Sequence, residues 1–173
     1  MEELKYPIGR FENQATISLE LWNDYVETLR NFPGLIKQET QGLSDQILNT
    51  PYRPDGWTVR QVVHHCADSH INCLMRLKLA LTEENPTIKP YLEDKWAKLP
   101  DSNLDLNPSM LILEGVHQKI VCVIESLNEE DLKRTYIHPE HGKTFTILEL
   151  IALYAWHCKH HLAHVQLVTK ANK

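Results

Sequence analysis

The sequence predicts an all-α fold, a four-helix bundle whose helices are joined by long connections. Four long segments repeat apolar residues at helical spacing, signals for strands are weak, and helix-capping patterns precede several of these segments. A chain of 173 residues is long enough for one domain with a sizeable core. We therefore expect residues 1–173 to form a single helical domain.

The first long helix is predicted in SLELWNDYVETLRNF, after an irregular arm that reaches about Thr16. Its apolar residues lie on one helical face, and they are Leu19, Trp22, Val26 and Leu29. Pro33 follows within the same stretch. Because proline has no backbone N–H, we expect it to kink this helix or to restart it.

The second helix is predicted to follow the proline-rich connection NTPYRPDGW. Thr58 and Gln61 form a T-x-x-Q capping box at its start, and the helical pattern continues for about 26 residues. A long connection comes next, and we expect a short helix within it, around Leu92 to Leu99.

The third and fourth helices also begin at recognisable signals. Asn107 is the predicted cap of the third helix, with Pro108 at its first position. Thr146 and Glu149 form a capping box for the last helix, and YIHPEHGKTF before it suggests a small hairpin. The two long connections argue against a plain up-down-up-down bundle.

Composition excludes several classes of protein. The net charge of −5, without a basic cluster, argues against nucleic-acid binding. No apolar run approaches the ~18 residues of a membrane span, and the N-terminus lacks a signal-peptide pattern, so we expect a soluble cytoplasmic protein. The four cysteines form no CxxC pair, which argues against a disulfide framework or a zinc ribbon.

Four histidines gather in HCKHHLAHV near the end of the chain. Helical geometry places His157, His160, His161 and His164 on one side, continuing the apolar stripe, with Lys159 on the opposite side. Burying an unpartnered imidazole costs about 1–3 kcal/mol, and a metal ion would offset this cost by taking neutral imidazoles as ligands.

Two of these spacings suit a metal site. His157/His161 and His160/His164 are both i,i+4 pairs, which present two ring nitrogens to one ion. A third ligand is expected from the second helix, which contains His64, His65 and His70. His65 shares a polar stripe with Asp68, a candidate supporting carboxylate or additional ligand.

Other catalytic patterns are absent or incomplete. HExxH is missing, and only Glu114-Gly-Val-His117 matches the Glu-x-x-His element that di-iron bundles carry twice. No G-x-S-x-G motif or phosphate loop is present.

The segments YPIGRF, PYRPDGWTVRQVVHH, ADSHIN and YAWHCKHHLAH resemble the DinB/YfiT-like metal-dependent hydrolases over nearly the whole chain. The resemblance implies a DinB-like four-helix bundle, commonly dimeric, that binds one divalent ion through three histidines. The family's first ligand lies eight residues after the tryptophan of its G-W-[ST] motif, which is His65 here. We map its H-x-x-x-H motif to His160 and His164, which leaves His157 and His161 as pocket groups.

A three-histidine site with an open water position suits Zn²⁺ or Ni²⁺, one ion per chain. The leading hypothesis is a hydrolase acting on a small-molecule substrate, with Asp68, His157 and His161 as candidate general bases. One alternative is a transferase that uses a low-molecular-weight thiol, since some DinB-like proteins do so. The other is a non-catalytic metal-binding module with a closed shell of four ligands.

Overall fold

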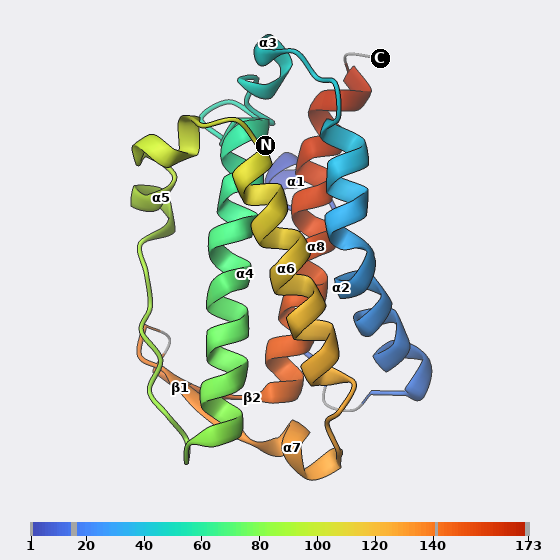
Figure 1. The fold of residues 1–173 in the computed structure, drawn as a ribbon, viewed down its shortest axis with the longest axis vertical. Coiled ribbons are helices and arrows are strands. Elements are labelled where there is room, and N and C mark those ends of the chain that lie inside the picture. Colours follow the sequence, from blue (N-terminus) through green and yellow to red (C-terminus); the bar gives the residue numbers. More distant parts are fainter. Residues whose placement is uncertain (1, 15–16, 141, 172–173) are drawn as a thin grey trace.

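Four long helices form the body of the protein in the computed structural model, which describes residues 2–14, 17–140 and 142–171 (Figure 1). They are α2 (Leu19–Thr40), α4 (Val59–Thr82), α6 (Asn107–Ile124) and α8 (Ile147–Ala171). Short elements occupy the connections: α1 (Glu2–Lys5), α3 (Asp45–Leu48), α5 (Glu93–Trp96), the 3-10 helix η1 (Pro100–Asn103) and α7 (Glu129–Lys133). The predicted all-α four-helix bundle is confirmed.

The hairpin predicted before the last helix is also present. Strands β1 (Thr135–His138) and β2 (Lys143–Thr146) pair antiparallel, with Thr135 opposite Thr146 and His138 opposite Lys143. The hairpin lies at the end of the bundle where α8 begins (Figure 1).

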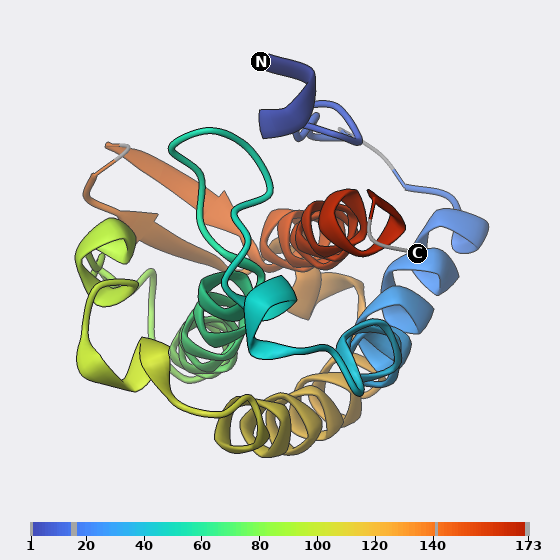
Figure 2. The same cartoon turned by 90° about the horizontal axis from the view of Figure 1, so that it is seen from above.

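The helices follow an up-down-down-up course rather than the plain alternation. In Figure 1, α2 and α8 run upward, whereas α4 and α6 run downward. Each of α2 and α4 packs against both α6 and α8, so α2 lies diagonally across the bundle from α4, and α6 lies diagonally across from α8 (Figure 2). As a result α4 and α8 are antiparallel neighbours, and the first turns of α4 face the second half of α8.

Most of the predicted helix starts are confirmed by their hydrogen bonds. Thr58 and Gln61 form the capping box of α4, and the Thr146 hydroxyl accepts from the Glu149 backbone N–H at 3.1 Å. The cap of α6 was predicted one residue late, because Asn107 is already helical and its N–H donates to Asp105. The predicted end of the N-terminal arm near Thr16 falls outside the described residues.

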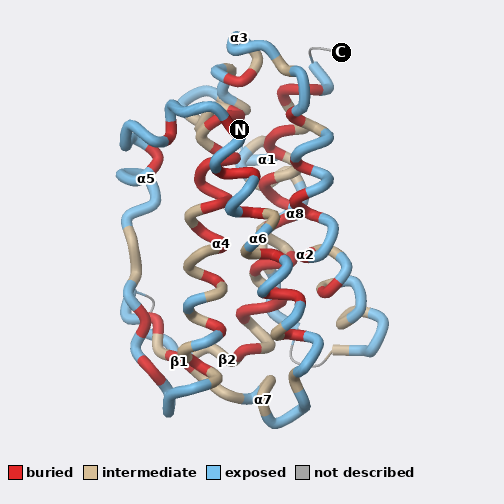
Figure 3. The backbone as a smooth tube through the Cα atoms, viewed as in Figure 1, coloured by how far each residue is buried: buried red, intermediate tan, exposed pale blue. Residues whose placement is uncertain are grey.

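α2 continues through Pro33 instead of restarting after it, and it bends along its length (Figure 1). Buried residues, red in Figure 3, lie along each of the four long helices and form one hydrophobic core. Phe32, Ile36, Leu77 and Leu113 are among the large residues that are fully buried there. Among the described helices, none is long and apolar enough to cross a membrane.

The capping box of α4 gives a test of the fold. Replacing Thr58 by Ala removes the oxygen that accepts from the Gln61 N–H, so we expect the free energy of unfolding to fall by about 1 kcal/mol. Thr58→Ser keeps this oxygen and should retain most of the stability. Equal losses for both variants in urea titrations would show that the hydroxyl does not contribute through capping.

Candidate metal centre

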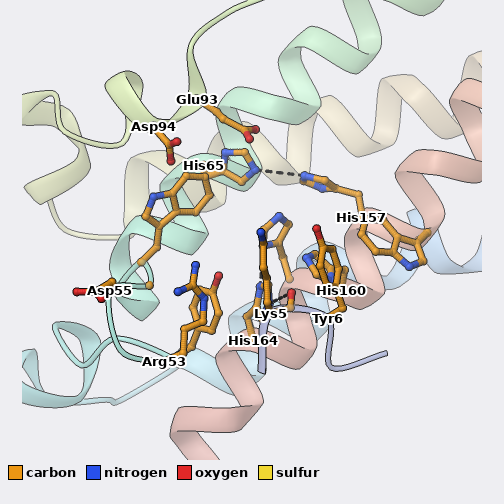
Figure 4. Close-up of a pocket in the computed structure, with 15 residues that line it drawn as sticks. Lys5, Tyr6, Arg53, Asp55, His65, Glu93, Asp94, His157, His160 and His164 are labelled. Carbon is orange, nitrogen blue, oxygen red and sulfur yellow. Dashed lines mark hydrogen bonds between the residues drawn. The ribbon is translucent and has the colours of Figure 1, made fainter. Parts of the chain in front are cut away.

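A cavity of about 410 Å³ opens between the first half of α4 and the second half of α8. The N-terminal arm, the loop before α4, α5 and the two helices all contribute to its wall (Figure 4). The lining residues are Lys5, Tyr6, Tyr52, Arg53, Asp55, Gly56, Trp57, His65, Glu93, Asp94, Trp156, His157, His160, His161 and His164. The cavity therefore collects all four histidines of α8 and His65 of α4.

The loop before α4 shapes one side of the cavity. Its ends are joined where the Tyr52 N–H donates to the Trp57 carbonyl at 3.2 Å. A β-carbon on Gly56 would lie 2.7 Å from the Arg53 side chain, so the tight turn requires glycine there. The turn places the Trp57 ring 4.5 Å from the ring of His65, and it places Tyr52 in a stack on His164 at 3.9 Å.

His65 meets two of the α8 histidines. Its Nε2 atom lies 3.2 Å from the Nε2 atom of His157, and its ring centre lies 4.8 Å from that of His161. Each of these three residues offers one ring nitrogen as a ligand atom, and the three atoms lie within 4.8 Å of one another. Two neighbouring helices thus bring three imidazoles to one point.

His160 and His164 belong to a different group. They lie together with His161, again with ligand atoms within 4.8 Å. Among the described residues, no such group contains His65 together with His160 or His164. The set His65, His160 and His164 stays a sequence prediction, and the geometry favours His157 and His161 as the partners of His65.

The surroundings of His160 and His164 differ from those of the first group. The ring of His160 stacks on Trp156 at 4.3 Å, and its buried Nδ1 atom has no hydrogen-bond partner within the described structure. Both ring nitrogens of His164 are in use, because Nε2 lies 3.2 Å from the Lys5 carbonyl and Nδ1 lies 3.3 Å from Nδ1 of His161.

Burial keeps these imidazoles neutral. It lowers the pKa of His65 and of His164 to about 4 and that of His160 to about 3. Neighbouring imidazoles add to the effect at His65 and His160, and the Arg53 charge adds to it at His164. The pKa values of His157 and His161 are also lowered, by burial and by neighbouring imidazoles. Neutral imidazole is the form that binds a metal ion.

Two carboxyl groups with raised pKa values, Asp68 and Glu93, differ in their position relative to the cavity. Asp68 does not line the cavity; burial, with a contribution from Asp101, raises its pKa to about 6. Glu93 of α5, which the sequence did not single out, lines the same cavity as His65 (Figure 4). Burial raises the pKa of Glu93, and Asp94 and Glu140 raise it further.

Comparison with known proteins shows the family of this chain. The model of the DinB superfamily matches residues 26–165. The chain belongs to the DinB superfamily. Relatives named "Putative metal-dependent hydrolase" from Bacillus cereus (strain 03BB102) and Bacillus anthracis (strain CDC 684 / NRRL 3495) are 47% and 46% identical, respectively, over 98% of both chains.

A solved structure is similar over the same length. It is described as "YfiT from Bacillus subtilis is a probable metal-dependent hydrolase with an unusual four-helix bundle topology". The identity is 39%, the TM-score is 0.94, and 98% of each chain is covered. The DinB/YfiT-like resemblance drawn from the sequence motifs is confirmed.

The neutral histidines predict a pH dependence for the metal-free protein. Histidines of the unfolded chain titrate near pH 6.5, whereas folding lowers the pKa of His65, His117 and His164 to about 4. Between these values the unfolded chain binds more protons, so the free energy of unfolding should fall as the pH drops from about 6.5 to 4 and should not depend on these groups above about pH 7. Urea titrations with a chelator present would measure this, and equal stability at pH 7 and pH 5 would contradict it.

Proposed function

We propose that the chain binds one divalent metal ion through His65, His157 and His161 and uses it to hydrolyse a small-molecule substrate in the adjoining cavity. The observation that carries the proposal is the approach of the His65 and His157 Nε2 atoms to 3.2 Å, with His161 completing the group. Its relatives named "Putative metal-dependent hydrolase" support the reaction class.

The donor set fits a zinc-like ion. Zinc–nitrogen bonds of about 2.0–2.1 Å at tetrahedral angles place two ligand nitrogens about 3.3 Å apart. The 3.2 Å between Nε2 of His65 and Nε2 of His157 is close to this value. Ni²⁺ is the alternative ion, because imidazole nitrogen suits both metals.

The site would keep an open position on its cavity side. Among the described residues the group around His65 has three members and no fourth, which supports an enzyme rather than a closed metal-binding module. A divalent ion held there supplies a Lewis acid that polarises a substrate carbonyl and makes water more acidic.

Glu93 is the residue we propose as the proton acceptor. Its side chain lines the same cavity as His65, and its raised pKa brings it closer to the range useful for general base catalysis near neutral pH. Asp68 loses this role because it lies away from the cavity, and His157 and His161 lose it because they are assigned to the ion.

Single substitutions on α8 separate the two ligand sets. We expect His157→Ala and His161→Ala to lose stoichiometric Zn²⁺, because each removes one of three ligands. His160→Ala, on the same helix and in the same cavity, is the matched control and should retain one ion per chain. Elemental analysis after Zn²⁺ loading and desalting gives the answer. Metal retained in His157→Ala but lost in His160→Ala would restore the set predicted from sequence.

Turnover assays separate hydrolysis from thiol transfer, since both reactions can use the same three ligands. We expect the Zn²⁺-loaded protein to release product from ester or amide probes without added thiol, and Glu93→Gln to lower kcat by about 10²-fold or more. A strict requirement for a low-molecular-weight thiol, with the thiol incorporated into the product, would instead establish the transferase.

A further inference from the structure

Beyond the proposed ligands, two more imidazoles continue from His157 into the bundle core. The Nδ1 atom of His157 lies 3.0 Å from Nε2 of His70, and Nδ1 of His70 lies 2.6 Å from Nε2 of His117. His70 and His117 are 1% and 2% exposed, so water does not compete for these contacts. His157, His70 and His117 thus form a hydrogen-bond chain that joins α8, α4 and α6 in that order.

The chain ends on the backbone carbonyl of Leu29 in α2, which lies within hydrogen-bond distance of Nδ1 of His117. In a regular helix this carbonyl would accept from the N–H four residues later. That residue is Pro33, which has no N–H. The proline therefore leaves the Leu29 carbonyl available to His117.

This anchor determines where each proton lies. A carbonyl only accepts, so Nδ1 of His117 carries the proton and its Nε2 accepts from His70. His70 then donates from Nδ1 and accepts at Nε2 from Nδ1–H of His157. Burial lowers the pKa of all three imidazoles, which keeps each ring neutral with a single N–H. The unprotonated Nε2 of His157 is left facing His65.

A shorter chain of the same kind ends at His161. Nε2 of His164 lies 3.2 Å from the Lys5 carbonyl, so it carries the proton and leaves Nδ1 as an acceptor. Nδ1 of His161 lies 3.3 Å from that acceptor and donates to it. The unprotonated nitrogen of His161 is therefore Nε2 as well.

We infer that His70, His117 and His164 are positioning residues: two hydrogen-bond chains, anchored on the Leu29 and Lys5 carbonyls, hold His157 and His161 in the Nδ1–H tautomer, so that both present Nε2 lone pairs to the metal ion. The inference rests on the proposed ligand set, and it assigns the predicted ligand His164 a supporting role. Groups that orient a metal-binding histidine in this way typically change metal affinity by 10- to 100-fold.

A second metal site in the core is the competing explanation, because His70, His117 and Cys158 also bring possible ligand atoms within 4.8 Å. The 2.6 Å between the His70 and His117 nitrogens suits a hydrogen bond, since a tetrahedral zinc ion would hold them about 3.3 Å apart. Burial also raises the pKa of the Cys158 thiol, which disfavours the thiolate that a metal requires.

Tautomers can be read directly from long-range ¹H–¹⁵N correlation spectra of the ¹⁵N-labelled, metal-free protein at pH 7. We expect the Nδ1–H form for His157, His70, His117 and His161, and the Nε2–H form for His164. An Nε2–H form at His157 or His161 would overturn the inference. The spectrum requires no metal, so it judges the hydrogen-bond chains even if the wild-type protein fails to bind Zn²⁺ and the proposed function is wrong.

Substitution of His117 tests whether the long chain affects metal binding, since His117 lies two imidazoles away from the proposed ligand. We expect His117→Leu to weaken Zn²⁺ binding by at least 10-fold in competition with a chromophoric chelator. His117→Gln, which can accept from His70 and donate to Leu29, should recover most of this affinity.

His64→Leu is the matched control. His64 is also a buried imidazole of α4 with two contacts, to Ser109 at 2.7 Å and to the Leu104 carbonyl at 3.1 Å, but it belongs to neither chain. We expect the Zn²⁺ affinity of the His64→Leu variant to differ from that of the wild-type protein by less than 2-fold. Equal losses in His64→Leu and His117→Leu, or binding of a second Zn²⁺ that His117→Leu abolishes, would contradict the inference. If His117→Leu fails to fold by circular dichroism, His117→Gln and the wild-type spectrum decide.

Discussion

Neutral imidazoles enclosed by the bundle are the constraint on which the rest of this structure depends. Each has one N–H and one lone pair, and leaving either without a partner away from water costs about 1–3 kcal/mol. For His157 and His161 the protein meets this demand with chains of imidazoles that end on backbone carbonyls, as from His157 through His70 and His117 to Leu29. The nitrogens left over converge beside His65, which is where a metal ion is proposed to bind.

The fold supplies the partners at each step. The up-down-down-up course makes α4 and α8 antiparallel neighbours, so an early turn of α4 faces the histidines of α8. α6 contributes His117, and α2 contributes the Leu29 carbonyl that Pro33 leaves without a helical donor. Pro33 thus has a consequence beyond the bend of α2, because it links backbone geometry to the protonation pattern of side chains on the three other long helices.

The sequence predicted the helices, the capping boxes and the hairpin well, because these depend on local spacing. It also predicted a histidine metal centre, since buried imidazoles on one helical face require partners. Helical spacing alone could not choose between the two H-x-x-x-H pairs of HCKHHLAHV, and the assignment to His160 and His164 rested on the family resemblance. His157/His161 and His160/His164 differ by three positions, and only the rotation of α8 against α4 decides which pair faces His65.

The sequence also could not predict contacts between residues that are far apart along the chain. His70 and His117 are separated by 47 positions, and nothing in their local patterns indicates that their rings meet. Glu93 sits in a four-residue helix within a long connection, whose path depends on how it packs over α4. Asn107 fits a helix cap by composition, yet the helix begins one residue earlier because Asp105 accepts its N–H.

The position of the bound ion is the most direct test of this account. Anomalous diffraction from a Zn²⁺-soaked crystal, collected on both sides of the zinc absorption edge, would locate it without reference to activity. The account predicts one peak about 2.0–2.1 Å from ring nitrogens of His65, His157 and His161. A peak bound by His160 and His164, or one among His70, His117 and Cys158, would contradict it.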